Sequence, residues 1–87
     1  MEIKDNGIVI VDFYATWCGP CQMLSPILEE LKEKYKVEKV NVDEHPDLAK
    51  ENGIMSIPTV FIYKDKKLIN KFIGYKTKEE IERLIEM

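Results

Sequence analysis

The stretch from Ile8 to Cys21, IVIVDFYATWCGPC, decides the fold of this 87-residue chain and locates its reactive groups. Its first seven residues are apolar apart from one aspartate and one tyrosine, which predicts a strand buried on both faces. The motif Trp17-Cys18-Gly19-Pro20-Cys21 follows and contains the only two cysteines. Because a helix that begins near Pro20 puts residues three apart on one face, Cys21 should lie within disulfide reach of Cys18. A bond across so short a loop adds little stability, so the pair is predicted to carry electrons rather than to brace the fold.

The positions of the two cysteines predict different roles. Cys18 lies at or before the first helical turn, where free backbone amides and the positive end of the helix dipole favour its thiolate. It should therefore be the attacking sulfur, and Cys21, one turn further in, should be the resolving thiol. A tetrahedral zinc site needs more ligands than this pair. The chain offers no third cysteine and one histidine, His45, in a polar turn, so we expect no metal.

Beyond the motif, the sequence predicts an alternation of helices and strands. Apolar residues at helical spacing indicate a helix from Cys18 to Tyr35, which Pro26 should kink. The other expected elements are a strand over Lys39–Val42, a short helix around Leu48, strands over Thr59–Tyr63 and Leu68–Ile73, and a last helix that opens on a Thr77/Glu80 capping box. The order β-α-β-α-β-β-α predicts one α/β domain over residues 1–87, with a mixed four-stranded sheet and helices on both faces.

Composition narrows the class of protein. Hydrophobic residues make up 45% and charged residues 33% of the chain, which is typical of a globular protein. A net charge of -3 gives no footprint for nucleic acid or anionic lipid, so neither is expected as a partner. The first apolar run, which Asp12 closes, is too short for a signal peptide or a membrane span. We therefore expect a cytoplasmic protein, in a compartment that keeps paired thiols mostly reduced.

Asp12 and Pro58 leave alternatives open. Asp12 is the only charged residue in the first strand. If its side chain is buried, its pKa rises and it can accept the proton of Cys21; if it points into solvent at the strand end, it has no such part. The sequence favours neither alternative. Pro58 stands where the third strand should begin, and frequency alone favours a trans bond between Ile57 and Pro58.

The motif and several residues downstream resemble the thioredoxin family in order and spacing, namely Asp12 to Cys21, Pro26, Val42-Asp43, Gly53-Ile54 and Ile57-Pro58-Thr59. The resemblance implies a thioredoxin-like fold and a thiol-disulfide oxidoreductase that reduces protein disulfides by dithiol-disulfide exchange. It implies that Cys18 is the nucleophile, Cys21 the resolving thiol and Asp12 a buried carboxylate behind them. It also implies that Pro58 is cis and faces the disulfide.

The same resemblance implies a substrate surface and a set of partners. The surface would consist of Trp17, Gly19, Pro20, Ile57, Pro58 and Gly74, and the loop that carries Ile57 would pair with the substrate backbone as an added strand. Lys39 aligns with a lysine near the buried aspartate, and Pro26 with a proline in the helix that follows the motif. Disulfide-containing proteins would be the substrates, and a thioredoxin-reductase-type protein would be the electron donor. No cofactor is implied beyond the redox-active disulfide between the two cysteines.

Three departures from the family pattern carry expectations of their own. We expect the fold to lack the family's N-terminal β-α unit, because residues 1–7 cannot supply it, and this makes the 39–42 strand a sheet edge. Residues 1–6 or a second copy of the chain should cover that edge, giving a monomer or a weak dimer. Gln22 replaces a common lysine, which removes a positive charge near the thiolate. The turn over residues 64–67 lacks the family's usual glycine.

The sequence also allows two other functions. A glutaredoxin-like oxidoreductase that uses glutathione would have a similar length and element order, but the Trp-led Gly-Pro motif and Asp12 favour thioredoxin. Alternatively, the fold could serve partner docking without redox chemistry, in which case substitution of Cys18 would leave partner affinity intact. Met23 and Met55 are either adaptable contact residues beside the motif or filling of the core.

Overall fold

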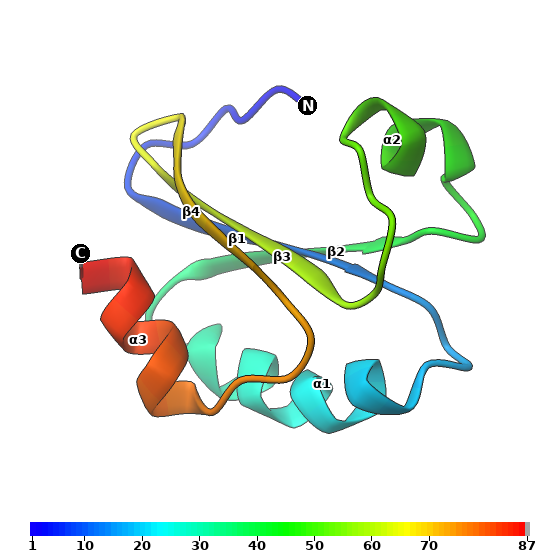
Figure 1. Ribbon diagram of the computed structural model, residues 1–87. Coiled ribbons are helices and arrows are strands. Elements are labelled where there is room, and N and C mark those ends of the chain that lie inside the picture. Colours follow the sequence, from blue (N-terminus) through cyan, green and yellow to red (C-terminus); the bar gives the residue numbers. More distant parts are fainter. Residues whose placement is uncertain (87) are drawn as a thin grey trace.

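The computed structural model describes residues 1–86, and its elements follow the predicted order (Figure 1). They are β1 (Ile8–Tyr14), α1 (Gly19–Leu31), β2 (Lys36–Asn41), α2 (Pro46–Glu51), β3 (Thr59–Lys64), β4 (Lys67–Ile73) and α3 (Lys78–Glu86). The sheet has the strand order β2-β1-β3-β4. β1 and β2 are parallel, whereas β3 is antiparallel to both β1 and β4, so the predicted mixed four-stranded sheet is confirmed.

The turn between α1 and β2 differs from prediction. The helix ends at Leu31 rather than at Tyr35. The amides of Lys34 and Tyr35 both donate to the carbonyl oxygen of Leu31, at 3.1 and 2.9 Å. These bonds satisfy the last carbonyl group of the helix and turn the chain back towards the sheet, so that β2 begins at Lys36 rather than at Lys39. Pro26 lies inside α1, as predicted.

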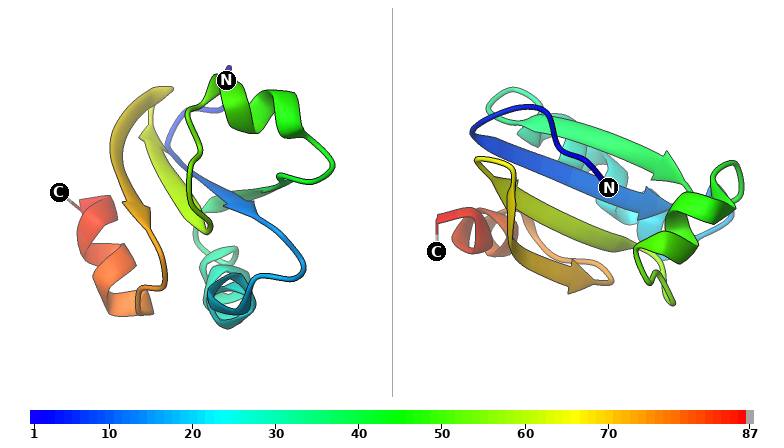
Figure 2. Two further views of the ribbon diagram at one scale, coloured as in Figure 1. Left: turned by 45° about the vertical axis from the view of Figure 1, so that its right-hand side comes forward. Right: turned by 90° about the horizontal axis from the view of Figure 1, so that it is seen from above.

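Helices cover both faces of the sheet, as predicted (Figure 2). α1 and α3 pack on one face, over a buried cluster that includes Ile10, Leu28 and Ile81. α2 and the segment before β1 lie on the other face, over a cluster that includes Val11 and Phe13. Successive side chains of β1 therefore enter two different cores, which explains why this strand is apolar along nearly its whole length.

The last helix begins with the reciprocal hydrogen bonds of the predicted capping box. The Glu80 amide donates to Thr77 Oγ1 at 3.2 Å, and the Thr77 amide donates to Glu80 Oε1 at 2.9 Å. The hydrogen bonds from Thr77 lower the pKa of the exposed Glu80 carboxyl. The helix then packs Ile81 and Ile85 into the core.

The segment before β1 does not extend the sheet beside β2. Ile3 packs into the cluster on the α2 face, and Asp5 forms an ion pair with Lys36 at 3.2 Å. Within residues 1–86, β2 is an edge strand. The expectation that residues 1–6 cover this edge is therefore wrong, because burying Ile3 draws the segment across the face of the sheet. None of the helices described combines the length and apolarity that a membrane crossing requires.

Candidate active site

The two cysteines open α1 and form a disulfide. Cys18 is the N-cap residue, Cys21 lies in the first turn, and their Cα atoms are 5.2 Å apart. Gly19 and Pro20 fill the first helical positions, where a proline costs no hydrogen bond because its missing amide has no partner within the helix. The amide of Cys21 donates to Cys18 Sγ at 3.2 Å. The exposed fractions of the two residues, 5% and 4%, are nearly equal, so exposure alone does not distinguish the attacking sulfur in the oxidised state.

A second chain segment reaches Cys18 from the start of β3. The Ile57-Pro58 bond is cis, as the family resemblance implied. The carbonyl oxygen of Ile57 lies 3.7 Å from Cys18 Sγ. Gly74, just after β4, donates its amide to the carbonyl oxygen of Pro58 at 2.8 Å. The structure therefore brings the Ile57 loop to the sulfur of Cys18 and joins the end of β4 to that loop, although the three segments lie far apart in the sequence.

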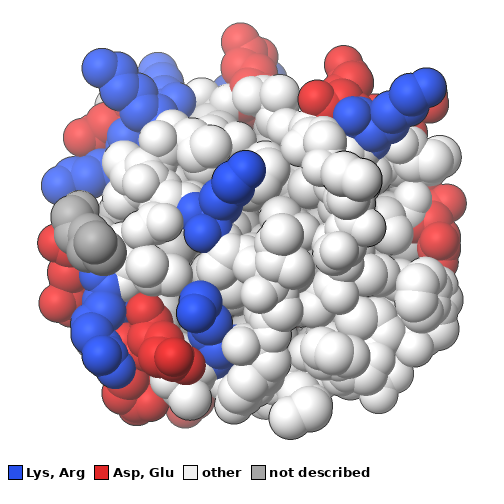
Figure 3. All heavy atoms as spheres, in the orientation of Figure 1, with Lys and Arg blue, Asp and Glu red and all other residues white. Residues whose placement is uncertain are grey.

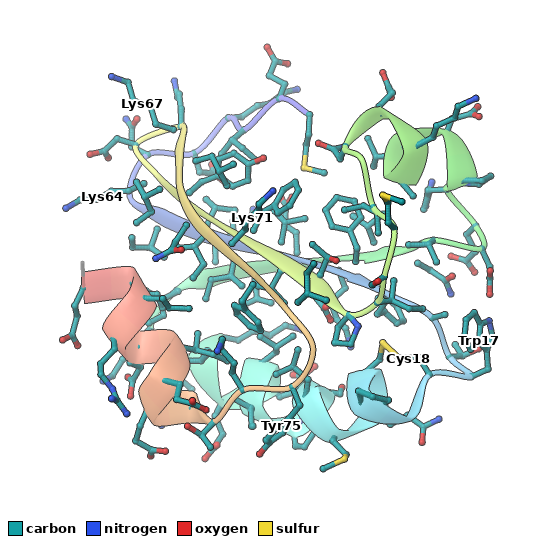
Figure 4. All side chains as sticks on the ribbon, viewed as in Figure 1. Trp17, Cys18, Lys64, Lys67, Lys71 and Tyr75 are labelled. Carbon is teal, nitrogen blue, oxygen red and sulfur yellow. A yellow bond between two sulfur atoms is a disulfide. The ribbon has the colours of Figure 1, made fainter. Side chains whose placement is uncertain are left out.

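Apolar side chains surround this point and face solvent. The exposed fractions are 69% for Trp17, 60% for Met23, 96% for Met55 and 44% for Tyr75. Figure 3 shows a broad surface on this side of the molecule that carries few charged side chains, and Figure 4 places Trp17, Cys18 and Tyr75 along it. Because the side chains of Met23 and Met55 are exposed, they fit the interpretation as contact residues and not the interpretation as filling of the core.

Sequence reasoning missed the partner of the exposed tryptophan. Trp17 Nε1 donates to Asp43 Oδ2 at 2.8 Å, and the Asp43 amide donates to Asn41 Oδ1 at 2.9 Å. In the sequence, Asp43 stands out only as part of the family pattern. A cavity of about 210 Å³ lies beside Trp17, with Val42, Ile54, Met55 and Ile57 among its lining residues. The ring is thus held in place by one polar contact, while most of its area stays accessible.

Asp12 is buried, which decides between its two interpretations. Its exposed fraction is 1%, and neither carboxylate oxygen has a hydrogen-bond partner among the described residues. It lies two positions after Ile10 on β1, so its side chain points to the face covered by α1. Burial raises the pKa of Asp12 to about 6, and the positive charge of Lys39, opposite it on β2, partly offsets that rise.

Lys39 stands on the solvent side of this aspartate. Its Nζ donates to Ser25 Oγ at 3.2 Å and lies 4.7 Å from the centre of the Tyr14 ring. Together with Cys21 these residues line a cavity of about 220 Å³. Cys21 therefore borders a solvent-accessible cavity on the Lys39 side, whereas Cys18 is contacted by the Ile57 loop.

The remaining residues singled out in the sequence are exposed. Gly19 and Pro20 are exposed at the start of α1, and Pro26 is exposed within the helix. His45 is exposed in the turn before α2. Within residues 1–86, no group of three or more histidine, cysteine or carboxylate side chains is arranged to hold a metal ion.

Comparison with known proteins identifies the family. The thioredoxin family model matches residues 1–87. The chain belongs to the thioredoxin family. It is 47% identical over 84 residues to the thioredoxin of Listeria monocytogenes, covering 92% of this chain and 82% of the relative. It is 49% identical over 84 residues to the thioredoxin of Alicyclobacillus acidocaldarius, covering 92% and 80%.

Solved structures of thioredoxins agree with this fold. A mutant thioredoxin from Halobacterium salinarum superposes with a TM-score of 0.87 at 40% identity, covering 94% of this chain and 74% of that one. Oxidised mitochondrial thioredoxin 3 from Saccharomyces cerevisiae gives a TM-score of 0.83 at 42% identity, covering 95% and 80%. The thioredoxin-like fold is therefore confirmed. With a disulfide-forming Cys18-Cys21 pair, the protein is a thiol-disulfide oxidoreductase of the thioredoxin type rather than of the glutaredoxin type.

Proposed function

We propose that this thioredoxin-family protein works chiefly as a reductant of protein disulfides, with a fixed division of labour between Cys18, Cys21 and Asp12. The Cys18 thiolate attacks one sulfur of the substrate disulfide, that bond breaks, and a mixed disulfide forms while one substrate thiolate leaves. Cys21 then loses its proton and attacks Cys18 Sγ. The second substrate thiolate leaves, the bond between Cys18 and Cys21 forms, and two electrons have passed to the substrate.

The observation that carries this assignment is the place of Cys18 at the N-cap of α1. The Cys21 amide donates to Cys18 Sγ at 3.2 Å. In the reduced protein the same amide and the positive end of the helix stabilise a charge on that sulfur. Cys21, inside the first turn, has no comparable position. Cys18 is therefore the better nucleophile of the pair.

Asp12 is assigned as the group that accepts the proton of Cys21. A pKa of about 6 leaves the carboxylate mostly ionised at pH 7 yet more basic than an ordinary aspartate. Its oxygens have no partner among the described residues, so they are free to accept a proton, and Lys39, opposite Asp12 on β2, lines the same cavity as Cys21. Lys39 holds the pKa below the value that burial alone would give.

The substrate surface is assigned to Trp17, Gly19, Pro20, Ile57, Pro58 and Gly74. Ile57 is supported by the approach of its carbonyl oxygen to Cys18 Sγ, and Pro58 and Gly74 by the hydrogen bond that joins the end of β4 to the Ile57 loop. An extended substrate segment can lie against the Ile57 loop with its own cysteine next to Cys18. The exposed apolar ring of Trp17 supplies area for side chains that flank that cysteine.

The proposal includes the surroundings in which this chemistry would operate. Disulfide-bearing proteins are the substrates, a thioredoxin-reductase-type protein returns the electrons, and the reducing cytoplasm is the compartment. Residues 1–87 act as one domain, as a monomer or a weak dimer. Pro26 has a supporting role within α1. The reaction needs no metal or organic cofactor, because the two sulfurs carry both electrons.

Trapping tests the division of labour. The Cys21→Ser variant, reduced and mixed with oxidised insulin as the probe, should accumulate a mixed disulfide, because the resolving thiol is missing. Peptide mapping should place that bond at Cys18. The matched Cys18→Ser variant should accumulate far less. Equal trapping by both variants, or by neither, would refute the assignment of Cys18 as the attacking sulfur.

A further inference from the structure

Lysines gather on the β3–β4 hairpin and along β4, although the chain as a whole is acidic. Residues 64–76 contain five of the 13 basic residues and a single acidic residue, Asp65, whereas the net charge of the chain is -3. The Asp65 carboxylate already accepts a hydrogen bond from the Gly7 amide. No ion pair joins Lys64, Lys67 or Lys71 to any other residue within 1–86. These positive charges are therefore not neutralised within the described chain.

Apolar side chains lie between these lysines and face solvent. Leu68 is 49% exposed and Ile73 is 63% exposed. The register pairs Leu68 with Tyr63, Lys71 with Phe61 and Ile73 with Thr59, so all three β4 side chains lie on the α2 side of the sheet. β4 ends the sheet, and no strand described in residues 1–86 pairs with its outer side. The outer side of β4 thus combines a row of backbone groups that pair with no other described strand, exposed apolar side chains and the positive charge of Lys71.

The β4 edge runs into the redox site. At its end Ile73 and Tyr75 are exposed, and Gly74 between them is hydrogen-bonded to Pro58 of the Ile57 loop. In Figure 4, Lys67, Lys71 and Tyr75 follow the course of β4 and of the segment after it, and β4 runs from the hairpin towards Cys18. In Figure 3 the same side is largely uncharged, with isolated lysines rising from it. A protein held at Cys18 can therefore extend a segment along β4 without crossing a helix.

We propose that the β4 edge docks an extended, acidic segment of the protein whose disulfide is reduced, a proposal that rests on the function assigned above. The segment would add a strand to β4, place carboxylates by Lys67 and Lys71, and lay apolar side chains on Leu68 and Ile73. Seven residues of β4 span about 23 Å, which suits a segment of similar length. Lysines on an edge also oppose self-association. Two features favour a docking role for these lysines. Exposed apolar side chains lie next to them, and the strand that carries them leads to the reacting sulfur.

Two synthetic peptides form the test. Lys67 pairs with Lys64 and Lys71 with Phe61, so the two lysines point to opposite faces of the sheet. Each peptide carries one intramolecular disulfide next to an extended segment of about seven residues. Two positions on opposite faces of that segment, placed to lie by Lys67 and Lys71, are glutamate in one peptide and glutamine in the other, and the remaining positions are valine. The measurement is the second-order rate constant for reduction by the pre-reduced protein. At about 20 mM ionic strength the glutamate peptide should react about fivefold faster, as expected for two partly exposed charge pairs. At about 0.5 M salt this preference should largely disappear.

Variants locate the preference on β4. In the Lys67→Glu/Lys71→Glu double variant the ratio of the two rate constants should fall to about one or below, and Lys67→Gln/Lys71→Gln should give about one. Lys4→Glu, on the exposed segment before β1, changes the net charge by as much as Lys67→Gln/Lys71→Gln does and should keep the wild-type ratio. Equal rates for the two peptides in the wild type, or a preference that survives in both double variants, would overturn the docking site. If the wild type reduces neither peptide, the proposed function itself fails.

Discussion

The redox site and the β3–β4 hairpin differ in whether their carboxylates are hydrogen-bonded. At the redox site the Asp12 carboxylate is buried without a hydrogen-bond partner among the described residues, and Trp17 is largely exposed. At the hairpin, Asp65 and Gly7 exchange two hydrogen bonds, at 2.8 and 3.0 Å. A buried carboxylate without partners costs stability, whereas a turn with satisfied groups adds to it. One region is arranged for reactivity, and the other holds the strands together.

This difference separates the expected consequences of mutation. Substitutions at the redox site should change the rate of disulfide exchange, and some should stabilise the fold. Substitutions in the hairpin turn should change stability and leave exchange intact. Each of the following variants tests whether effects on exchange and effects on stability are separate in this way. The largest effect is expected at the sulfur of Cys18.

Replacing the nucleophile should nearly abolish activity. Cys18→Ser leaves a hydroxyl that is not ionised near neutral pH, so we expect at least about a thousandfold loss of insulin-reduction rate. The free energy of unfolding should stay within about 1 kcal/mol of that of the reduced wild type, because serine has a similar size and shape. Rates and urea unfolding curves check both statements. If a residual rate within tenfold of wild type were measured, Cys18 could not be the attacking sulfur.

Replacing the buried carboxylate should stabilise the protein at high pH. The pKa of Asp12 rises from an ordinary 3.8 to about 6 on folding. Its contribution to stability is thus fully present below about pH 3.8 and is lost as the pH rises through about 6. The wild type should lose about 3 kcal/mol from this group between pH 4 and pH 8, and Asp12→Asn should not. Urea unfolding of both oxidised proteins at the two pH values measures the difference.

The same substitution should slow the chemistry. Without a proton acceptor for Cys21, Asp12→Asn should reduce insulin about tenfold more slowly at pH 7, and the two proteins should converge at pH 5, where the wild-type carboxyl is mostly protonated. Glu44→Gln, at an exposed position, is the matched loss of one charge and should affect neither the rate nor the pH dependence of stability. A pH-independent gap in rate between wild type and Asp12→Asn would rule out the proton-acceptor role.

The local features of the sequence predicted most of the architecture and the reactive pair. Spacing within one segment placed Cys21 within reach of Cys18, and the Thr77/Glu80 pattern gave the start of α3 because both partners lie in one turn. Features that depend on contacts between residues far apart in the sequence were harder to predict. The hydrogen bond between Trp17 and Asp43 joins residues 26 positions apart, and nothing in the local pattern of either residue indicates it.

Burial of a polar residue was the hardest feature to predict. Asp12 lies near the end of an apolar strand, and the sequence does not show that α1 covers that end. The segment before β1 was misplaced for a related reason. Its single apolar anchor, Ile3, finds the core on the sheet face, and this contact outweighs any strand pairing at the β2 edge.

At the hairpin, removal of the Asp65 side chain should destabilise without slowing exchange. Asp65 has a positive φ of 50°, which aspartate and asparagine tolerate better than alanine. Asp65→Ala also loses the acceptor of the Gly7 amide. We expect a loss of about 1 to 2 kcal/mol in the free energy of unfolding and an unchanged rate of insulin reduction. Asp65→Asn keeps an oxygen acceptor and should be nearly neutral. A loss of activity in Asp65→Ala that exceeds twofold would contradict the separation of the two regions.

The smallest expected effect is a gain at the other turn residue. Lys66 has a φ of 73°, and with Asp65 it forms a two-residue turn with both φ values positive, a conformation that favours glycine at this position. Lys66→Gly removes the left-handed strain but increases the freedom of the unfolded chain, so the net gain should be about 0.5 to 1 kcal/mol. Lys66→Ala is the control, since it removes the charge and keeps the strain, and it should bring no gain. Equal gains in both variants would show that charge repulsion among the hairpin lysines, rather than backbone geometry, is the cost at this turn.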